Sequence, residues 1–118
     1  MHIRFTMIDY NNRVFKPVST SDNGEVDSET LFVYKQKEGV VTCEYRGANI
    51  RYGHLLAIVS ASGQLDMTYH QVNIKNEIVT GLCKSVPELL PNGKIRLKEE
   101  WQWTCRDYSK GYSVLEEM

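Results

Sequence analysis

One carboxyl group of the sequence lies in an apolar pattern. Glu99 belongs to the segment Lys94–Arg106, in which apolar and polar residues alternate. With a period of two, the same face of a strand also carries Ile95, Leu97, Trp101, Trp103 and Cys105. Burial there raises the pKa of a carboxyl group that has no partner. Glu99 is therefore the candidate for a general acid or base, or for a ligand's hydrogen-bond acceptor.

The alternative for Glu99 is an internal ion pair that fixes strand register. Its candidate partner is Arg51, in the segment Asn49–Ser60, where two phases stay open. Either Ile50, Tyr52, His54, Leu56 and Ile58 point inward, or Arg51, Gly53, Leu55, Ala57 and Val59 do. In the second phase Arg51 pairs with Glu99 or holds an acidic group of a ligand. Glu117, in phase with Ser113 and Leu115, is a further candidate for an interior acid.

Other polar and aromatic residues share the inward phase of their segments. With Arg51 and Glu99 they form the predicted ligand-binding set: Tyr34, Gln36, Tyr45, Tyr69, Gln71, Asn73, Trp101 and Trp103. Two interpretations stay open. Large aromatic side chains among small residues such as Gly81 fill the taper of a barrel. Alternatively, an apolar interior with a few convergent polar groups is typical of a small-molecule pocket.

Several classes of function are excluded by composition and motifs. The net charge is −1, so we expect neither nucleic acid nor a membrane surface as a partner. The three histidines and three cysteines have no ligand spacing, and nucleotide-binding motifs are lacking, so we expect no metal and no cofactor. The start of the chain has no apolar run typical of a signal peptide, which favours a cytoplasmic protein.

The elements that must position these residues are strands. Turn signals of Gly and Asn recur along the chain, from Asn11-Asn12 to Lys110-Gly111. Eight segments rich in β-branched and aromatic residues lie between them: Arg13–Ser19, Ser28–Lys37, Val40–Arg46, Asn49–Ser60, Gln64–Ile74, Glu77–Ser85, Lys94–Arg106 and Tyr112–Glu117. Only one link, Ser85–Asn92, is long. Short links predict an all-β, eight-stranded antiparallel meander that closes into an up-and-down barrel.

The length of 118 residues predicts one domain over residues 1–118. Residues 1–6 precede the regular pattern and are expected to form a tail or an extra edge strand. A structural module, with an outer face or edge strand as the contact of a homodimer, stays open as an alternative function.

The chain resembles a family of small bacterial proteins often labelled N-acetylglutamate synthase. The resembling pieces include Asn23-Gly24-Glu25-Val26, Ile50-Arg51-Tyr52-Gly53, Gly63-x-Leu65-Asp66-Met67-x-Tyr69 and Ile95-Arg96-Leu97-x-Glu99-x-Trp101-x-Trp103. The resemblance implies a lipocalin-like or avidin-like barrel. The sequence contains no motif for acetyl-coenzyme A, and we expect a protein that binds a small molecule inside the barrel. An enzyme that uses Glu99 as acid or base is the alternative.

Overall fold

The structure, a computed structural model, describes residues 8–118. The tail or extra strand predicted for residues 1–6 lies outside this range. Nine strands are formed: β1 (Val14–Thr20), β2 (Phe32–Val33), β3 (Lys35–Lys37), β4 (Val40–Tyr45), β5 (Ile50–Val59), β6 (Leu65–Asn73), β7 (Ile78–Leu89), β8 (Ile95–Trp103) and β9 (Lys110–Glu117). Within residues 8–118, no helix is long and apolar enough to cross a membrane.

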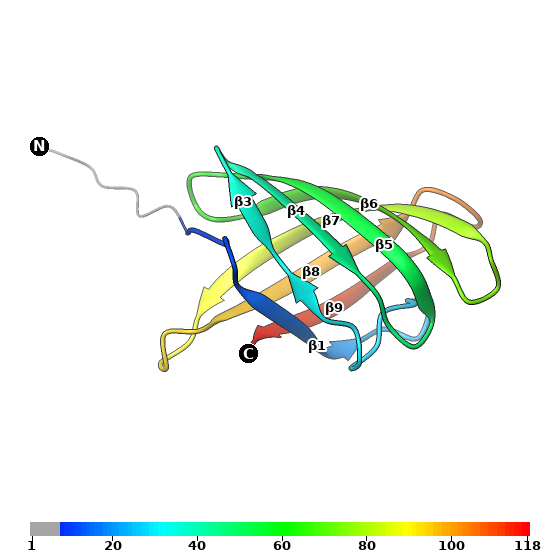
Figure 1. Ribbon diagram of the computed structural model, residues 1–118, viewed down its shortest axis with the longest axis horizontal. Coiled ribbons are helices and arrows are strands. Elements are labelled where there is room, and N and C mark those ends of the chain that lie inside the picture. Colours follow the sequence, from blue (N-terminus) through cyan, green and yellow to red (C-terminus); the bar gives the residue numbers. More distant parts are fainter. Residues whose placement is uncertain (1–7) are drawn as a thin grey trace, which may run out of the picture.

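The strands form one antiparallel sheet in the order β2-β1-β9-β8-β7-β6-β5-β4-β3. Because β2 and β3 are separated only by Tyr34, the two ends of the sheet belong to one stretch of chain, and the barrel is nearly closed (Figure 1). The predicted meander barrel is confirmed. The predicted strand Ser28–Lys37 is divided, because its first part pairs with β1 and its second with β4.

One predicted connection is wrong. The segment that was expected to link Ser85 to Asn92 continues as β7 as far as Leu89, which pairs with Ile95 of β8. The chain reverses in a tight turn, in which the Leu90 backbone N–H donates to the Lys94 carbonyl at 2.8 Å. Every link from β3 to β9 is therefore short, as an antiparallel meander requires.

The two ends of the barrel are built differently. At the left of Figure 1, the turns 38–39, 60–64 and 90–93 surround what we call the closed end. Tyr10 is fully buried there, and its hydroxyl donates to the Gly63 carbonyl at 2.5 Å. The ring centroids of Phe15 and Tyr34 are 4.9 Å apart, and Tyr10 packs against both. At the right, the loops 21–31, 46–49, 74–77 and 104–109 surround the mouth end.

Apolar side chains also lie on the outer surface of the barrel. Six of them come from β5 and β7: Leu56, Ile58, Ile78, Leu82, Val86 and Leu89. The homodimer expected from an outer face stays a prediction.

Candidate functional site

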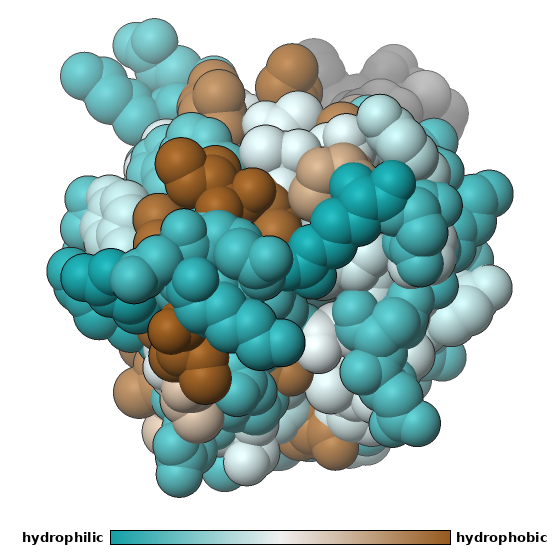
Figure 2. All heavy atoms as spheres, turned by 90° about the vertical axis from the view of Figure 1, so that its right-hand side faces the viewer, coloured by the Kyte–Doolittle hydropathy of each residue, from teal (hydrophilic) through white to brown (hydrophobic). Residues whose placement is uncertain are grey.

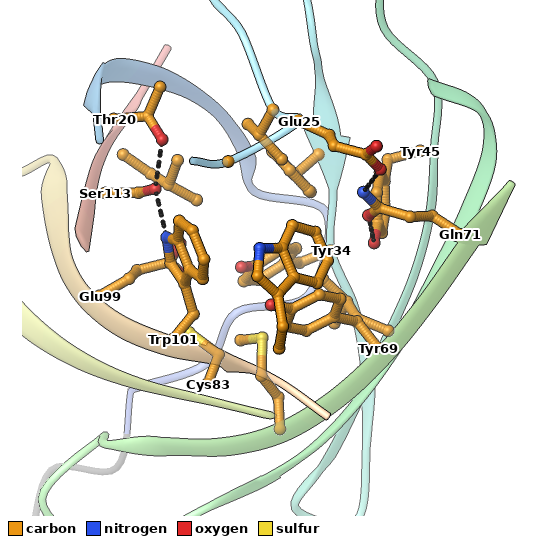
Figure 3. Close-up of a pocket in the computed structure, with 17 residues that line it drawn as sticks. Thr20, Glu25, Tyr34, Tyr45, Tyr69, Gln71, Cys83, Glu99, Trp101 and Ser113 are labelled. Atoms are coloured by element: carbon orange, nitrogen blue, oxygen red, sulfur yellow. Dashed lines mark hydrogen bonds between the residues drawn. The ribbon is translucent and has the colours of Figure 1, made fainter. Parts of the chain in front are cut away.

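A cavity of about 50 Å³ lies inside the barrel, between the closed end and the loop 21–31 (Figure 3). Seven of the ten predicted ligand-binding residues line it: Tyr34, Tyr45, Tyr69, Gln71, Glu99, Trp101 and Trp103. At about 10–15 Å³ for each water-sized probe, this space corresponds to a group of about three to five non-hydrogen atoms. The barrel interior was expected either to be filled by side chains or to contain a pocket. The structure has a cavity there.

Glu99 lies in the cavity wall on β8. Its direct neighbour across the sheet is Ser85 of β7, whose hydroxyl donates to Glu99 Oε2 at 2.5 Å. The part of the carboxyl side chain that stays accessible faces the cavity. Burial raises the pKa of Glu99 from 4.5 to about 7, although the hydrogen bonds from Ser85 and Cys83 oppose the shift.

The predicted ion pair between Arg51 and Glu99 is wrong. Arg51 is exposed on the outside of the barrel, and its guanidinium donates to the side chain of Asn76. The cause is a β-bulge: Ile50 pairs with Asn73 and Tyr52 with the adjacent Val72, so Arg51 is an extra residue. The inward phase is therefore Gly53, Leu55, Ala57 and Val59, preceded by Ile50 rather than by Arg51.

Glu117 has the cation that Glu99 lacks. Arg13 lies 2.9 Å from Glu117 at the closed end, and Glu117 also accepts the backbone N–H of Ile95. Among residues 8–118, no ion pair involves Glu99. The charge of Glu117 is therefore neutralised within the fold, whereas Glu99 is an acid of the cavity wall without a cation among residues 8–118.

Two other predicted residues, Gln36 and Asn73, lie outside the cavity. Gln36 is at the closed end, where its Oε1 accepts the backbone N–H of Tyr10 at 2.8 Å. Asn73 is buried at the mouth end and donates to Glu25 at 2.8 Å and to Glu77 at 2.9 Å. Both are used by the fold, Gln36 to anchor the chain before β1 and Asn73 to hold a loop.

The hydroxyl of Tyr34 is a buried polar group without a partner. The side chain is fully buried, lines the cavity, and its hydroxyl makes no hydrogen bond in the structure. Burial raises the pKa of Tyr34 well above its ordinary value, and the nearby Glu99 raises it further. Because a buried hydroxyl without a hydrogen bond costs free energy, this group is an argument for a bound molecule.

The aromatic walls depend on glycines in the neighbouring strands. Three cross-strand pairs repeat the same arrangement: Tyr45 with Gly53, Tyr69 with Gly81 and Trp101 with Gly111. A Cβ atom on any of these glycines would lie 2.2–2.3 Å from the ring opposite. The rings therefore lie across the adjacent strand and form a flat inner surface, a use of these glycines that turn patterns do not reveal.

The roof of the cavity was missed by sequence reasoning. Glu25 in the loop 21–31 lines the cavity and accepts a hydrogen bond from Gln71 at 2.8 Å, and Tyr45 donates to the same Gln71 at 2.8 Å (Figure 3). On the opposite side, Ser113 accepts the indole N–H of Trp101 at 3.0 Å. Glu25 follows the Asn23-Gly24 turn signal, and no periodicity marks a loop residue as part of an interior.

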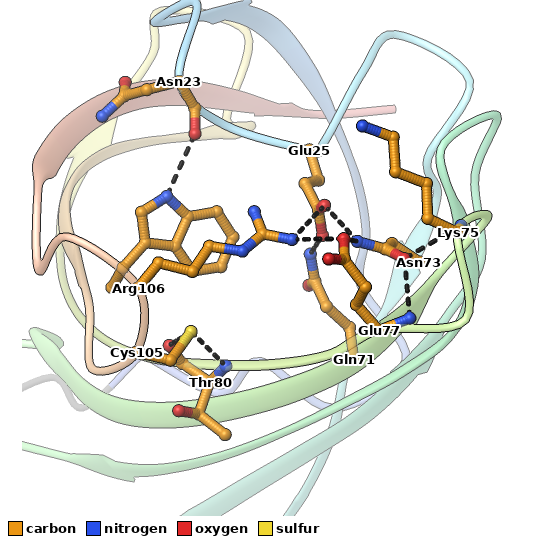
Figure 4. Close-up of polar contacts among 10 residues, drawn as sticks. Asn23, Glu25, Gln71, Asn73, Lys75, Glu77, Thr80, Cys105 and Arg106 are labelled. Carbon is orange, nitrogen blue, oxygen red and sulfur yellow. Dashed lines mark hydrogen bonds and ion pairs between the residues drawn. The ribbon is translucent and has the colours of Figure 1, made fainter.

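Arg106 closes the mouth end over this roof (Figure 4). Its Nη2 lies 2.7 Å from Glu77 and 3.7 Å from Glu25, and its guanidinium carbon is 5.9 Å from the centroid of the Trp103 ring. The Trp103 indole donates to the Asn23 carbonyl at 3.0 Å, which ties the same loop down. Figure 2, which looks onto this end, shows hydrophilic side chains across the face with hydrophobic groups between them.

A metal site is not part of this arrangement. In the described part of the chain, no three His, Cys, Asp or Glu side chains are placed to hold a metal ion. The chemistry available to the cavity is that of two carboxyl groups, an amide, a thiol, hydroxyl groups and aromatic rings.

Comparison with known proteins assigns a family to this barrel. The model of a family described as "Avidin-like protein" matches residues 8–118, which is the whole described range. No curated protein matches the chain. The nearly closed antiparallel meander and its internal cavity agree with the family match. The chain therefore belongs to the avidin-like protein family.

Proposed function

We propose that this protein binds a small molecule in the cavity of its barrel. The observation that carries the proposal is the juxtaposition of the unpartnered Tyr34 hydroxyl and the unpaired Glu99 carboxyl in one aromatic-walled cavity. Such groups do not stabilise a core, since burial without full pairing costs free energy. A ligand that bonds to both offsets that cost.

The test is a ligand screen with two matched variants. Small polar and amphipathic molecules are screened by ligand-observed NMR against the wild type, Leu55→Phe and Leu56→Phe. Leu55 lines the cavity, whereas its neighbour Leu56 is exposed on the outer face. We expect hits that Leu55→Phe loses and Leu56→Phe keeps, with both variants folded by thermal unfolding. An absence of hits, or hits that both variants keep, would contradict the proposal.

A second candidate function is proton transfer by Glu99. The specific observation is a carboxyl group that faces the cavity with a pKa of about 7, where an acid or base is effective at neutral pH. If the protein converts a ligand found in the screen, Glu99→Gln should still bind it and no longer convert it. Equal conversion by the variant would exclude this role.

We do not propose the N-acetylglutamate synthase activity that the resembling family carries as a label. That activity uses acetyl-coenzyme A, and a cavity of about 50 Å³ has no room for a nucleotide cofactor.

A further inference from the structure

The cavity has acidic groups and no basic group. Among the described residues that line it, Glu25 and Glu99 are acidic, and no Lys, Arg or His is present. Arg51, which was expected to hold an acidic group of a ligand, points away from the interior. An anionic ligand would meet like charge without a counter-ion, which is unfavourable in a poorly solvated site.

The aromatic walls of the cavity also favour a positively charged ligand. Six aromatic residues line the cavity: Phe32, Tyr34, Tyr45, Tyr69, Trp101 and Trp103. The rings of Trp101 and Trp103 meet edge to face at 5.4 Å between centroids. Aromatic faces attract organic cations, and the attraction grows when water is excluded.

A cation of the protein already uses the rim of this site. The guanidinium of Arg106 lies over Trp103 and close to Glu25, so an aromatic face and a carboxylate of the cavity wall bind a positive group together (Figure 4). The Arg106 side chain is 41% exposed and does not line the cavity itself. The deeper acid, Glu99, has no such cation in the described chain.

We infer that the cavity binds the protonated amino group of a small organic cation, with Glu99 as its counter-ion and Tyr34, Tyr69 and Trp101 around it. The inference rests on the proposed function and names its ligand class. An ammonium group has three N–H donors, and the cavity offers Glu99 and the unpartnered Tyr34 hydroxyl as acceptors. The volume of about 50 Å³ fits an ammonium group with about three carbon atoms.

The experiment compares three probes of similar size at pH 8: propylammonium, 1-propanol and propionate. Both tryptophans of the chain line the cavity, so intrinsic tryptophan fluorescence reports on binding at this site. Ligands of about four non-hydrogen atoms bind weakly, so titrations extend into the millimolar range. We expect propylammonium to bind at least tenfold more tightly than 1-propanol, and propionate to bind most weakly.

Two variants identify the counter-ion. Glu99→Gln keeps the size of the side chain and should lose the preference for propylammonium over 1-propanol. Glu100→Gln, the exposed neighbour on the outer face of β8, should keep it. If Glu99→Gln does not fold, the pH dependence of binding to the wild type tests the same role of Glu99. Propylammonium affinity should rise between pH 6 and pH 8 as Glu99 ionises, and 1-propanol affinity should not.

The outcomes separate the inference from the proposed function. If 1-propanol or propionate binds as tightly as propylammonium, or if Glu99→Gln keeps the cation preference, the cation inference is overturned and the binding cavity stands. If none of the three probes binds while the ligand screen gives cavity-specific hits, the inference is again overturned. If the screen gives none either, the proposed function fails as well.

Discussion

The two ends of the barrel divide stability and function between them. At the closed end, Tyr10, Phe15 and Tyr34 pack as an aromatic cluster, and the interior acid Glu117 is paired with Arg13. At the mouth end, polar side chains replace that packing: Gln71 and Asn73 each donate a hydrogen bond to Glu25 beneath Arg106. Both ends belong to the same strands, so the difference comes from side chains and loops.

The difference shows where this fold can accommodate polar groups. Apolar burial contributes most of the folding free energy, and the buried apolar side chains line the sheet interior along the length of the barrel. The mouth end contributes less per residue, because exposed ion pairs and loop contacts are weak. Glu99 and the Tyr34 hydroxyl lie between the two ends, where the closed end supports the cavity and the mouth end gives access to it.

The largest expected effect is the loss of the closed-end cluster. Phe15→Ala removes a fully buried ring that contacts Tyr10 and Tyr34, and should lower the free energy of unfolding by about 3–5 kcal/mol. Urea unfolding monitored by tryptophan fluorescence measures the change. A loss below about 1 kcal/mol would show that the closed end is not the main source of stability.

A smaller effect concerns the pH dependence of stability. The pKa of Glu99 is about 7 when folded and near 4.5 when unfolded, so between these values only the folded state holds the proton. The free energy of unfolding should therefore fall as the pH rises from about 4.5 through 7, by up to about 3 kcal/mol, and level off above. The titratable groups around Glu99 have raised pKa values and stay neutral in this range: Tyr34, Tyr45, Tyr69 and Cys83.

Glu99→Gln should remove this fall, and at pH 8 it should be more stable than the wild type. Glu100→Gln serves as the control and should keep the wild-type dependence, because Glu100 is exposed on the outer face. Urea unfolding at pH 5 and pH 8 gives the comparison. If the free energy of unfolding falls equally in the wild type and in Glu99→Gln, groups other than Glu99 cause the pH dependence.

The smallest effect is expected at the mouth end. Arg106→Gln removes two ion pairs and the contact with Trp103, yet it should change the free energy of unfolding by at most about 1 kcal/mol, because Arg106 and its nearer partner Glu77 are 41% and 50% exposed. The same variant should bind propylammonium more tightly, since the internal cation no longer competes at the rim. Thermal unfolding and the fluorescence titration measure the two effects. A loss comparable to that of Phe15→Ala would remove the contrast between the ends.

Much of the fold, and the central residue of the site, could be predicted from local patterns. The alternation in Lys94–Arg106 placed Glu99 and both tryptophans inside, and the structure has them on the cavity wall. The phase of Asn49–Ser60 could not be predicted, because an extra residue at Arg51 shifts it and both phases are apolar enough. Arg106 and Glu25 could not be predicted either, since they lie in loops where no period relates them to the interior.

By itself, the sequence determined the strands, the hairpin turns and the interior position of Glu99. These follow from side-chain alternation and from turn residues that tolerate tight backbone conformations, and both act between near neighbours in the chain. Only the tertiary structure decided that, among residues 8–118, Glu99 has no cation and Tyr34 has no hydrogen-bond partner, and that Arg106 covers the mouth. These depend on closure of the barrel and on loops that meet across it, where residues far apart in sequence come into contact.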